Sequence, residues 1–513
     1  MNADHAAAPA EIREVAVVGL GIMGAGIAEV LARSGRAVVV IEANHDFLAR
    51  GLARLHSSLD KAVARGRLTH AEKALIVARV RAADSIAAGA RDADLAIEAV
   101  PERLDLKRAI FAELDQACRA DTILATNTSS LSVTALAACT RHPDRVAGLH
   151  FFNPVPVMKL VEVISTVLTA PGTAQVLGAL VRDLGKTPVE AGDRAGFVVN
   201  PLLLPYLNHA ARLLETGHAS REDIDKAATG GFGLPMGPLA LLDLIGLDTS
   251  LSVLEALRAE LGGSRYQPAP LLRRLVEAGL TGRKAGRGFY DYEPARAPAA
   301  SAGDPSHNVP PAPATVALIG DPALAADLGN VLDAAGISVV RAPGPEASLV
   351  VAAAQPGRRV LDAALASGCP ADVVGIHLAG RPGAKPELAE LIVTDLTAPG
   401  AAAAAGALTA ELGLDPVTSR DRPGFLAAAM IYPQLNDAVR MVQDGYATPP
   451  DIDTAMVLGC GYPRGPLQML DDVRPAIVRD VLSAMHASTG DPAFAPAPLL
   501  AEHAASGTPF RCS

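Results

Sequence analysis

One histidine and one acid stand out in the mostly apolar stretch GLHFFNPVPVMKLVEVI, from Gly148 to Ile164. His150 lies beside two phenylalanines, and Glu162 lies within a run typical of a strand. Burying either group alone is costly, whereas burying them as a pair costs much less. A neutral imidazole is a suitable general base near pH 7, and an acid accepting from its other ring nitrogen would fix the tautomer and stabilise the cation formed. We therefore expect His150 and Glu162 to be partners in proton transfer.

Two further polar residues could act on a substrate oxygen. Ser129, just past the strand-like run TILATN, can donate a hydrogen bond to it, and Asn200 can orient it. Each has a structural alternative, because NTSS before LSVTALAAC reads as a helix cap and Asn200 stands at a helix start. Ser129 and Ser130 could divide the two roles between them.

A glycine pattern near the N-terminus lies in a strand–turn–helix–strand context. G-x-G-x-x-G follows the β-branched run Val15–Val18, opens a helical periodicity over Ile22–Arg33 and precedes a second apolar run at Ala37–Ile41. Such a loop turns tightly and lets the backbone approach a pyrophosphate, which the helix N-terminus receives. The predicted dinucleotide-binding loop consists of Gly19, Leu20, Gly21, Ile22, Met23 and Gly24.

Glu42 closes the second of these strands. An acid at this position accepts hydrogen bonds from a ribose diol and repels a 2′-phosphate. The cofactor is therefore predicted to be NAD rather than NADP.

The next segments continue the alternation of strands and helices. Apolar runs at Ala93–Val100, Thr122–Asn127 and Val146–Phe151 flank a helix that begins near Leu104. This rhythm predicts an α/β fold with a doubly wound, parallel Rossmann-type sheet. Ligands of such sheets bind beyond the carboxyl ends of the strands, which is where Ser129 and His150 stand.

Composition narrows the class of protein. The 513 residues are 50% hydrophobic, enough for about three to five domains, and carry a net charge of −10. This charge argues against a nucleic-acid-binding surface. The five cysteines are scattered without metal-ligand spacing, so we expect no metal and a reducing compartment. Neither a secretory signal nor an apolar run long enough for a membrane is evident, so the protein is expected to be cytoplasmic.

The C-terminal half repeats the helical segment that starts at Gly196. When Gly196 is aligned with Gly424, the coinciding pairs are Asn208/Asn436, Gly217/Gly445, Asp223/Asp451, Asp225/Asp453, Pro235/Pro463, Gly237/Gly465, Pro238/Pro466 and Asp243/Asp471. His377 and Glu390 correspond to His150 and Glu162 with one inserted residue, but Asp321 and Pro322 replace the glycine pattern after Gly320. We interpret this half as a degenerate second copy that has lost dinucleotide binding.

These patterns predict five regions. They are an NAD-binding domain at 12–195, an all-α domain at 196–293, a Pro- and Ala-rich linker at 294–314, a degenerate Rossmann-like domain at 315–420 and a second helical domain at 421–513.

Residues 12–292 resemble the 3-hydroxyacyl-CoA dehydrogenases over their whole length. The motifs that carry the resemblance are GLGIMGAGIAEVLARSG, TNTSSLSVT, GLHFFNPVPVMKLVEVI, GFVVNPLLLPYLNHA, GFGLPMGPLALLDLIGLDT and GRKAGRGFYDY. With its second helical domain, the chain is similar to the bacterial 3-hydroxybutyryl-CoA and 3-hydroxyadipyl-CoA type, the latter from phenylacetate breakdown. The resemblance implies reversible, NAD-dependent oxidation of an (S)-3-hydroxyacyl-CoA to the 3-oxoacyl-CoA, in fatty-acid β-oxidation or phenylacetate catabolism.

The same resemblance assigns roles to individual residues. It makes His150 the catalytic base and Glu162 its partner, with Ser129 and Asn200 in the active site. It adds cofactor contacts at Glu42, Glu102, Lys107, Asn153 and Lys284, although Glu102 and Lys107 would by default be solvated charges. CoA contacts fall on Ser58 and on Arg65, which replaces a lysine-like residue of the family. Arg54 and Lys61 belong to the same basic stretch. Pro201 follows Asn200 at a position where the family often has arginine.

Two alternatives from other classes remain open. A β-hydroxyacid dehydrogenase acting on a free acid shares the GLGIMG loop but uses a catalytic lysine, so His150→Ala would spare its activity. A non-catalytic protein on a dehydrogenase scaffold would fail to bind NADH.

Relatives with two domains dimerise through the helical domain. The repeat after Gly424 could stand in for that partner within one chain, as an alternative to a homo-oligomer. Deletion of residues 294–513 should then expose apolar surface and cause aggregation or dimer formation.

Overall fold

The structure, a computed structural model, describes residues 11–292, 311–380 and 386–511. Its contacts divide the chain into two compact units. The first consists of residues 1–201 and 445–460, and the second of residues 202–444 and 461–513. The predicted linker lies outside the described residues up to residue 310.

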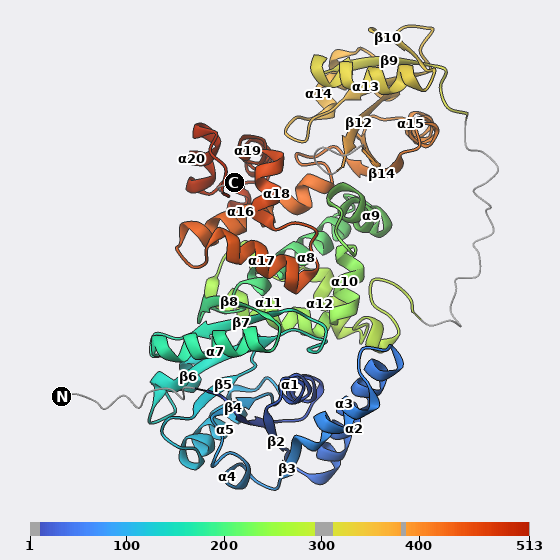
Figure 1. The fold of residues 1–513 in the computed structure, drawn as a ribbon. Coiled ribbons are helices and arrows are strands. Elements are labelled where there is room, and N and C mark those ends of the chain that lie inside the picture. Colours follow the sequence, from blue (N-terminus) through green and yellow to red (C-terminus); the bar gives the residue numbers. More distant parts are fainter. Residues whose placement is uncertain (1–10, 293–310, 381–385, 512–513) are drawn as a thin grey trace. The chain divides into compact units, whose positions relative to one another are not determined.

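The first unit is built on an eight-stranded sheet with strand order β3-β2-β1-β4-β5-β6-β7-β8 (Figure 1). Its strands are β1 (Glu14–Val18), β2 (Ala37–Ile41), β3 (Val80–Ala83), β4 (Leu95–Glu98), β5 (Ile123–Thr126), β6 (Val146–Phe151), β7 (Leu160–Ser165) and β8 (Thr187–Gly192). Its helices are α1 (Ile22–Arg33), α2 (His45–Ala64), α3 (His70–Ala78), α4 (Ile86–Gly89), α5 (Leu104–Ala117), α6 (Val133–Ala137), α7 (Pro171–Asp183) and α17 (Pro449–Cys460), and α8 (Val199–Glu215) begins in it.

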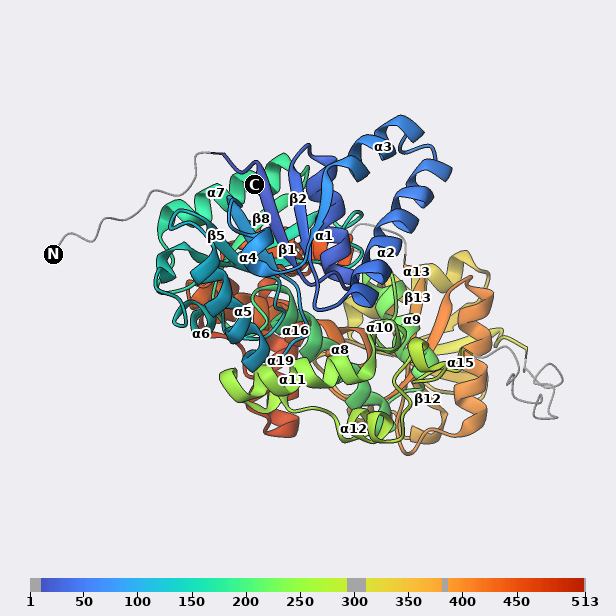
Figure 2. The same ribbon diagram turned by 90° about the horizontal axis from the view of Figure 1, so that it is seen from below.

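The predicted Rossmann-type elements are present. The β-branched runs in β1 and β2 form central strands whose valines are almost completely buried, because helices cover both faces of a parallel sheet. Helix α1 has the bounds expected from its periodicity. Helices α2 and α3 lie side by side as a hairpin between β2 and β3 (Figures 1 and 2).

One pair of strands departs from the predicted parallel sheet. β6 and β7 are antiparallel, whereas the other described neighbours in this sheet are parallel. The connection at 152–159 is too short for a crossover, which needs a dozen or more residues, so the chain turns back beside the strand it has left.

The second unit contains a six-stranded sheet with strand order β10-β9-β11-β12-β13-β14. Its strands are β9 (Thr315–Gly320), β10 (Ser338–Val340), β11 (Leu349–Ala353), β12 (Val373–Ala379), β13 (Leu388–Val393) and β14 (Asp415–Arg420). Its helices are α9 (Arg221–Phe232), α10 (Pro238–Ile245), α11 (Leu247–Leu261), α12 (Pro270–Glu277), α13 (Pro322–Ala334), α14 (Val360–Ala366), α15 (Pro399–Glu411), α16 (Ala427–Gln443), α18 (Pro466–Val473), α19 (Pro475–Thr489) and α20 (Pro498–Ser506). No helix within the described ranges has both the length and the apolar character needed to cross a bilayer.

The internal repeat is confirmed at the level of individual hydrogen bonds. The Asn208 side chain accepts from the Ala269 amide at 2.7 Å, and that of Asn436 accepts from the Ala497 amide at 2.8 Å. Asp243 binds the amides of Phe289 and Tyr290, and its counterpart Asp471 binds those of Phe510 and Arg511. The repeated polar residues therefore hold the same loops in both copies.

Candidate active site

His150 and Glu162 are directly opposite each other on β6 and β7. His150 Nδ1 lies 2.6 Å from Glu162 Oε2, and both residues are buried, with 6% and 0% of their surfaces exposed. Opposite residues in an antiparallel pair project from the same face, so the reversal after β6 is what brings the two side chains together. The rings of Phe152 and Phe197 lie 4.6 Å and 5.5 Å from the imidazole. The predicted pairing is confirmed in its geometry.

The second oxygen of Glu162 is held by the backbone at the start of α8. Glu162 Oε1 accepts from the amides of Val198 and Val199 at 2.9 Å and 3.0 Å. The turn before them places Phe197 at a φ of 57°, a conformation that costs energy for a bulky residue. Free helix N–H groups favour a carboxylate, so the strained turn orients Glu162 toward His150.

Ser129 and Asn200 are brought together. Asn200 Nδ2 donates to the Ser129 carbonyl at 3.3 Å. The capping alternative for Ser129 does not hold, because α6 begins at Val133 and its cap is Ser132, which accepts from the Ala135 amide. Asn200 is inside the first turn of α8, where a following proline is also tolerated. Ser129 and Asn200 are therefore free of the helix-capping role that the sequence left open for them.

Lys107 is not a solvated charge, and Glu102, whose side chain is 37% exposed, forms an ion pair with it. The Lys107 ammonium is fully buried, 2.8 Å from Glu98 and 3.2 Å from Glu102. Glu102 also accepts from the Thr128 hydroxyl and, at 2.9 Å, from the Ser129 amide. Burial opposes the charge of Glu102, but Lys107 and these hydrogen bonds outweigh it and lower its pKa. The sequence analysis missed Glu98, whose place in an apolar strand was the available signal.

The glycine loop has the shape that a dinucleotide requires. A Cβ on Gly24 would lie 1.8 Å from the Gly19 carbonyl oxygen, whereas a Cβ on Gly21 would meet nothing within 4 Å. Gly19 has a φ of 93°, and Gly21 caps α1 with no side-chain hydrogen bond. The space beside Gly21 is therefore open, as the close approach of a pyrophosphate to the loop requires, and Leu20, Ile22 and Met23 are the remaining loop residues.

Glu42 lies beside this loop. Its carboxylate accepts from the Leu20 amide at 2.7 Å and from the Ala43 amide at 2.9 Å. These bonds hold the acid directly after β2 and beside the glycine loop, the position expected for an acid that binds a ribose diol. The chain's own residues thus fit NAD.

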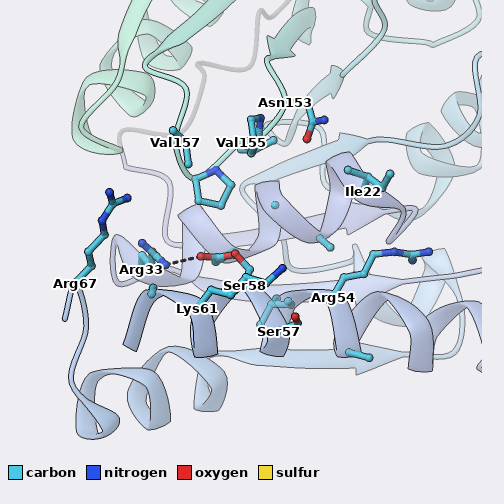
Figure 3. Close-up of a pocket in the computed structure, with 18 of the residues that line it drawn as sticks. Ile22, Arg33, Arg54, Ser57, Ser58, Lys61, Arg67, Asn153, Val155 and Val157 are labelled. Atoms are coloured by element: carbon cyan, nitrogen blue, oxygen red, sulfur yellow. Dashed lines mark ion pairs between the residues drawn. The ribbon is translucent and has the colours of Figure 1, made fainter. Parts of the chain in front are cut away.

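A basic groove lies between α1, α2 and the loop after β6 (Figure 3). It has a volume of about 710 Å³. Ser58 lines it together with Arg54, Lys61 and Arg65, which share one face of α2 and its C-cap. Asn153, predicted as a cofactor contact, lines the same groove.

The sequence analysis did not single out Glu29, which is 1% exposed under this groove. Its carboxylate pairs with Arg33 at 2.6 Å, the ion pair drawn in Figure 3. Burial raises the pKa of Glu29, although Ser58 and the charge of Arg33 act in the opposite direction. Glu29 therefore pairs with Arg33 at the floor of the groove.

Lys284 lies in the second unit, outside the unit that holds the other predicted site residues. Its ammonium pairs with Asp248 at 2.6 Å.

The second copy keeps the antiparallel strand pair of the site but not the hydrogen bond between histidine and glutamate. His377 and Glu390 are opposite each other on β12 and β13, yet His377 Nδ1 contacts the Ala354 carbonyl at 3.1 Å instead. Asp321 caps α13 by accepting from its first amides, so its carboxylate lies where a pyrophosphate would bind. Both changes support the interpretation of a degenerate copy.

Glu390 should make stability depend on pH. Burial raises its pKa to about 7. The unfolded chain releases the Glu390 proton above about pH 4.5, whereas the native state keeps it up to about pH 7. The wild-type protein therefore loses folding stability as the pH rises through about 7. We expect Glu390→Gln to become more stable than wild type by up to about 3 kcal/mol between pH 5 and pH 8. Thermal unfolding of both proteins at each pH measures this; a difference that does not change with pH would contradict it.

Comparison with known proteins places these residues in a family. The model for the 3-hydroxyacyl-CoA dehydrogenase NAD-binding domain matches residues 14–194, and that for the C-terminal domain matches 196–292 and again 424–511. The chain is 35% identical to 3-hydroxyadipyl-CoA dehydrogenase of Escherichia coli K12, over 96% of this chain and 98% of that protein. It is 46% identical to the probable 3-hydroxybutyryl-CoA dehydrogenase of Bacillus subtilis, over 55% of this chain and 98% of that protein. A crystal structure of Escherichia coli 3-hydroxybutyryl-CoA dehydrogenase matches with a TM-score of 0.80 and 32% identity, over 97% of this chain and 99% of that one.

Proposed function

Because this chain belongs to the 3-hydroxyacyl-CoA dehydrogenase family and is an NAD-dependent oxidoreductase, we propose that it oxidises an (S)-3-hydroxyacyl-CoA to the 3-oxoacyl-CoA with His150 as the general base. The observation that carries the proposal is the buried contact of 2.6 Å between His150 and Glu162, in the unit that also holds the glycine loop.

The contacts of Glu162 define the route of the proton. Because Nδ1 faces the Glu162 carboxylate, it carries the proton in the neutral ring and leaves the lone pair on Nε2. Nε2 takes the hydroxyl proton of the substrate, and Glu162 stabilises the imidazolium that forms. Bound NAD would supply the hydride acceptor for the carbon that carries this hydroxyl group. The reverse reaction returns the proton from Nε2.

Ser129 and Asn200 orient the substrate oxygen. The network of Glu102, Lys107 and Glu98 fixes the backbone of the Ser129 loop, and Asn200 contacts the same loop. A hydroxyl and an amide held in this way need little reorganisation as charge develops on the oxygen.

The groove beside Ser58 suits the phosphates of CoA. Arg54, Lys61 and Arg65 supply positive charge on a protein whose net charge is −10. Charge-assisted hydrogen bonds to phosphate are stronger than neutral ones. We assign the α2 side of this groove, with Ser58 and Arg65, to the substrate. We assign the cofactor to Glu42, the glycine loop, Glu102, Lys107, Lys284 and Asn153, which lies across the groove from α2.

Charge reversal in the groove should weaken CoA binding selectively. We expect Lys61→Glu with Arg65→Glu to raise KM for the acyl-CoA about tenfold or more, with little change in KM for NAD, because about 1.4 kcal/mol corresponds to a tenfold change. Arg91→Glu, at an exposed site outside the groove, is the control. Steady-state kinetics with each substrate varied measures the effect, and an equal rise in both KM values would contradict the assignment.

We propose the acyl group of the substrate from the names of the relatives. Their names indicate 3-hydroxybutyryl-CoA or 3-hydroxyadipyl-CoA, and hence fatty-acid or phenylacetate catabolism in the cytoplasm. The test is NADH formation at 340 nm from NAD and each of these two thioesters. Faster turnover of one thioester supports that substrate, and turnover of neither, with NADH still bound, rejects the proposed reaction.

A further inference from the structure

Helix α17 comes from the second copy yet belongs to the first compact unit. It packs against β7, which carries Glu162, and against β8 (Figure 1). The neighbouring segment is anchored as well: the Tyr446 hydroxyl donates to the Gly192 carbonyl at 2.7 Å, and the Arg194 guanidinium lies 4.6 Å from the Tyr446 ring. The segment therefore contacts the first unit both at Tyr446 and through α17.

The C-terminal end of α17 reaches the residues that surround the dyad. A Cβ on Gly459 would lie 2.8 Å from Leu160 Cδ2, 3.3 Å from Val199 Cγ2 and 3.6 Å from Phe152 Cε1. Each neighbour acts on the dyad. Leu160 shares a strand with Glu162, the Val199 amide donates to Glu162, and the Phe152 ring contacts the His150 ring.

Cys460 follows Gly459 as the last residue of α17 and is partly buried. Burial, and then the Glu162 charge, raise the pKa of its thiol to about 12. The thiol is therefore neutral near Glu162 and acts there as a small apolar group.

The reciprocal packing in the second unit provides an internal comparison. Helix α9, the first-copy equivalent of α17, packs against β13 and β14, and a Cβ on Gly231 would lie 3.1 Å from the Ala427 Cβ. Gly231 is the counterpart of Gly459 in the repeat. There the acid of the adjacent strand, Glu390, has no histidine hydrogen bond. Each copy thus packs this helix against the sheet of the other copy. Of the two described sheets, only the one that contacts α17 carries a hydrogen-bonded histidine–glutamate pair.

We propose that α17 of the degenerate copy is a positioning element of the active site in the first copy, with Gly459 packing against Leu160, Phe152 and Val199 so that Glu162 and His150 stay aligned. This inference rests on the proposed function. It gives the second copy a role in catalysis although the described part of that copy holds no dyad of its own.

The test compares Gly459→Val with its matched control Gly231→Val in the full-length protein. We expect Gly459→Val to lower kcat tenfold or more and to shift the pH profile of kcat, while KM for NAD changes less than twofold. Gly231→Val should retain kcat within twofold. Gly459→Ala, a smaller intrusion, should give an intermediate loss and serves in place of the valine variant if that one does not fold. A folded Gly459 variant with the wild-type kcat and pH profile, or equal losses in both glycine variants, overturns the proposal.

A second readout separates this inference from the proposed function. The His150 Nδ1 proton, followed by NMR of ¹⁵N-histidine-labelled protein without substrate, reports the contact with Glu162 directly. We expect this resonance to shift or broaden in Gly459→Val and Gly459→Ala and to be unchanged in Gly231→Val. If it shifts while the wild type does not oxidise either thioester, the positioning role stands and the reaction assignment fails. If it is unchanged in the Gly459 variants, the positioning role is rejected.

Discussion

His150→Ala is expected to lower kcat with the preferred thioester by about 10³-fold, with a smaller effect on KM. The substitution removes the base that takes the hydroxyl proton, and a well-placed general base contributes roughly 10²–10⁴-fold. It also leaves Glu162 buried with its two backbone donors but without its ring partner. NADH formation at 340 nm under saturating substrate measures kcat, and separate variation of each substrate shows whether binding survives.

The repeat supplies the control for this prediction. His377 occupies the corresponding position on β12 but contacts a backbone carbonyl, so His377→Ala should leave kcat unchanged. If His150→Ala retained activity, a lysine-dependent hydroxyacid dehydrogenase would become the better explanation. Loss of activity in His377→Ala with retention in His150→Ala would reverse the assignment of the two copies.

Lys107→Met is expected to lower the free energy of unfolding by about 3–5 kcal/mol. Glu98 is fully buried and accepts from Lys107 at 2.8 Å and 3.0 Å, from the Val100 amide and from the Thr126 hydroxyl. Without the ammonium, the buried Glu98 carboxyl group would have only neutral donors. The melting temperature of the first unit should fall by roughly 10 °C, as measured by calorimetry.

Two further variants test the cause of this loss. Arg81→Met breaks an ion pair of similar length with Glu14, but both partners are partly exposed, so the expected loss is below about 1 kcal/mol. The double variant Lys107→Met with Glu98→Leu removes both buried charges and should recover much of the stability. If the double variant were as unstable as Lys107→Met, the effect would come from packing rather than from an unpaired charge.

The sequence alone determined the elements whose signals are local. The glycine pattern, the apolar runs of β1 and β2 and the bounds of α1 could be predicted because turn chemistry and hydrophobic period act over a few residues. The partnership of His150 and Glu162 was also predictable, because two titratable groups in one apolar stretch require each other. The repeated asparagines and aspartates identified the duplication, since each holds a loop that both copies need.

Only the tertiary structure decided which distant groups meet. The sequence suggested that Lys107 is a surface charge on a helix, but β4 places Glu98 within 2.8 Å of its ammonium. Ser132 caps α6, and Asp193 accepts from the amides of Val133 and Thr134 in the same turn. The antiparallel return of β7 put the two members of the dyad on one face of the sheet. Helix α17 could not be assigned to the first unit from any local pattern, because its contacts with Leu160 and Phe152 depend on how residues far apart in sequence pack. Such contacts follow from the closure of the whole chain, which local propensities do not encode.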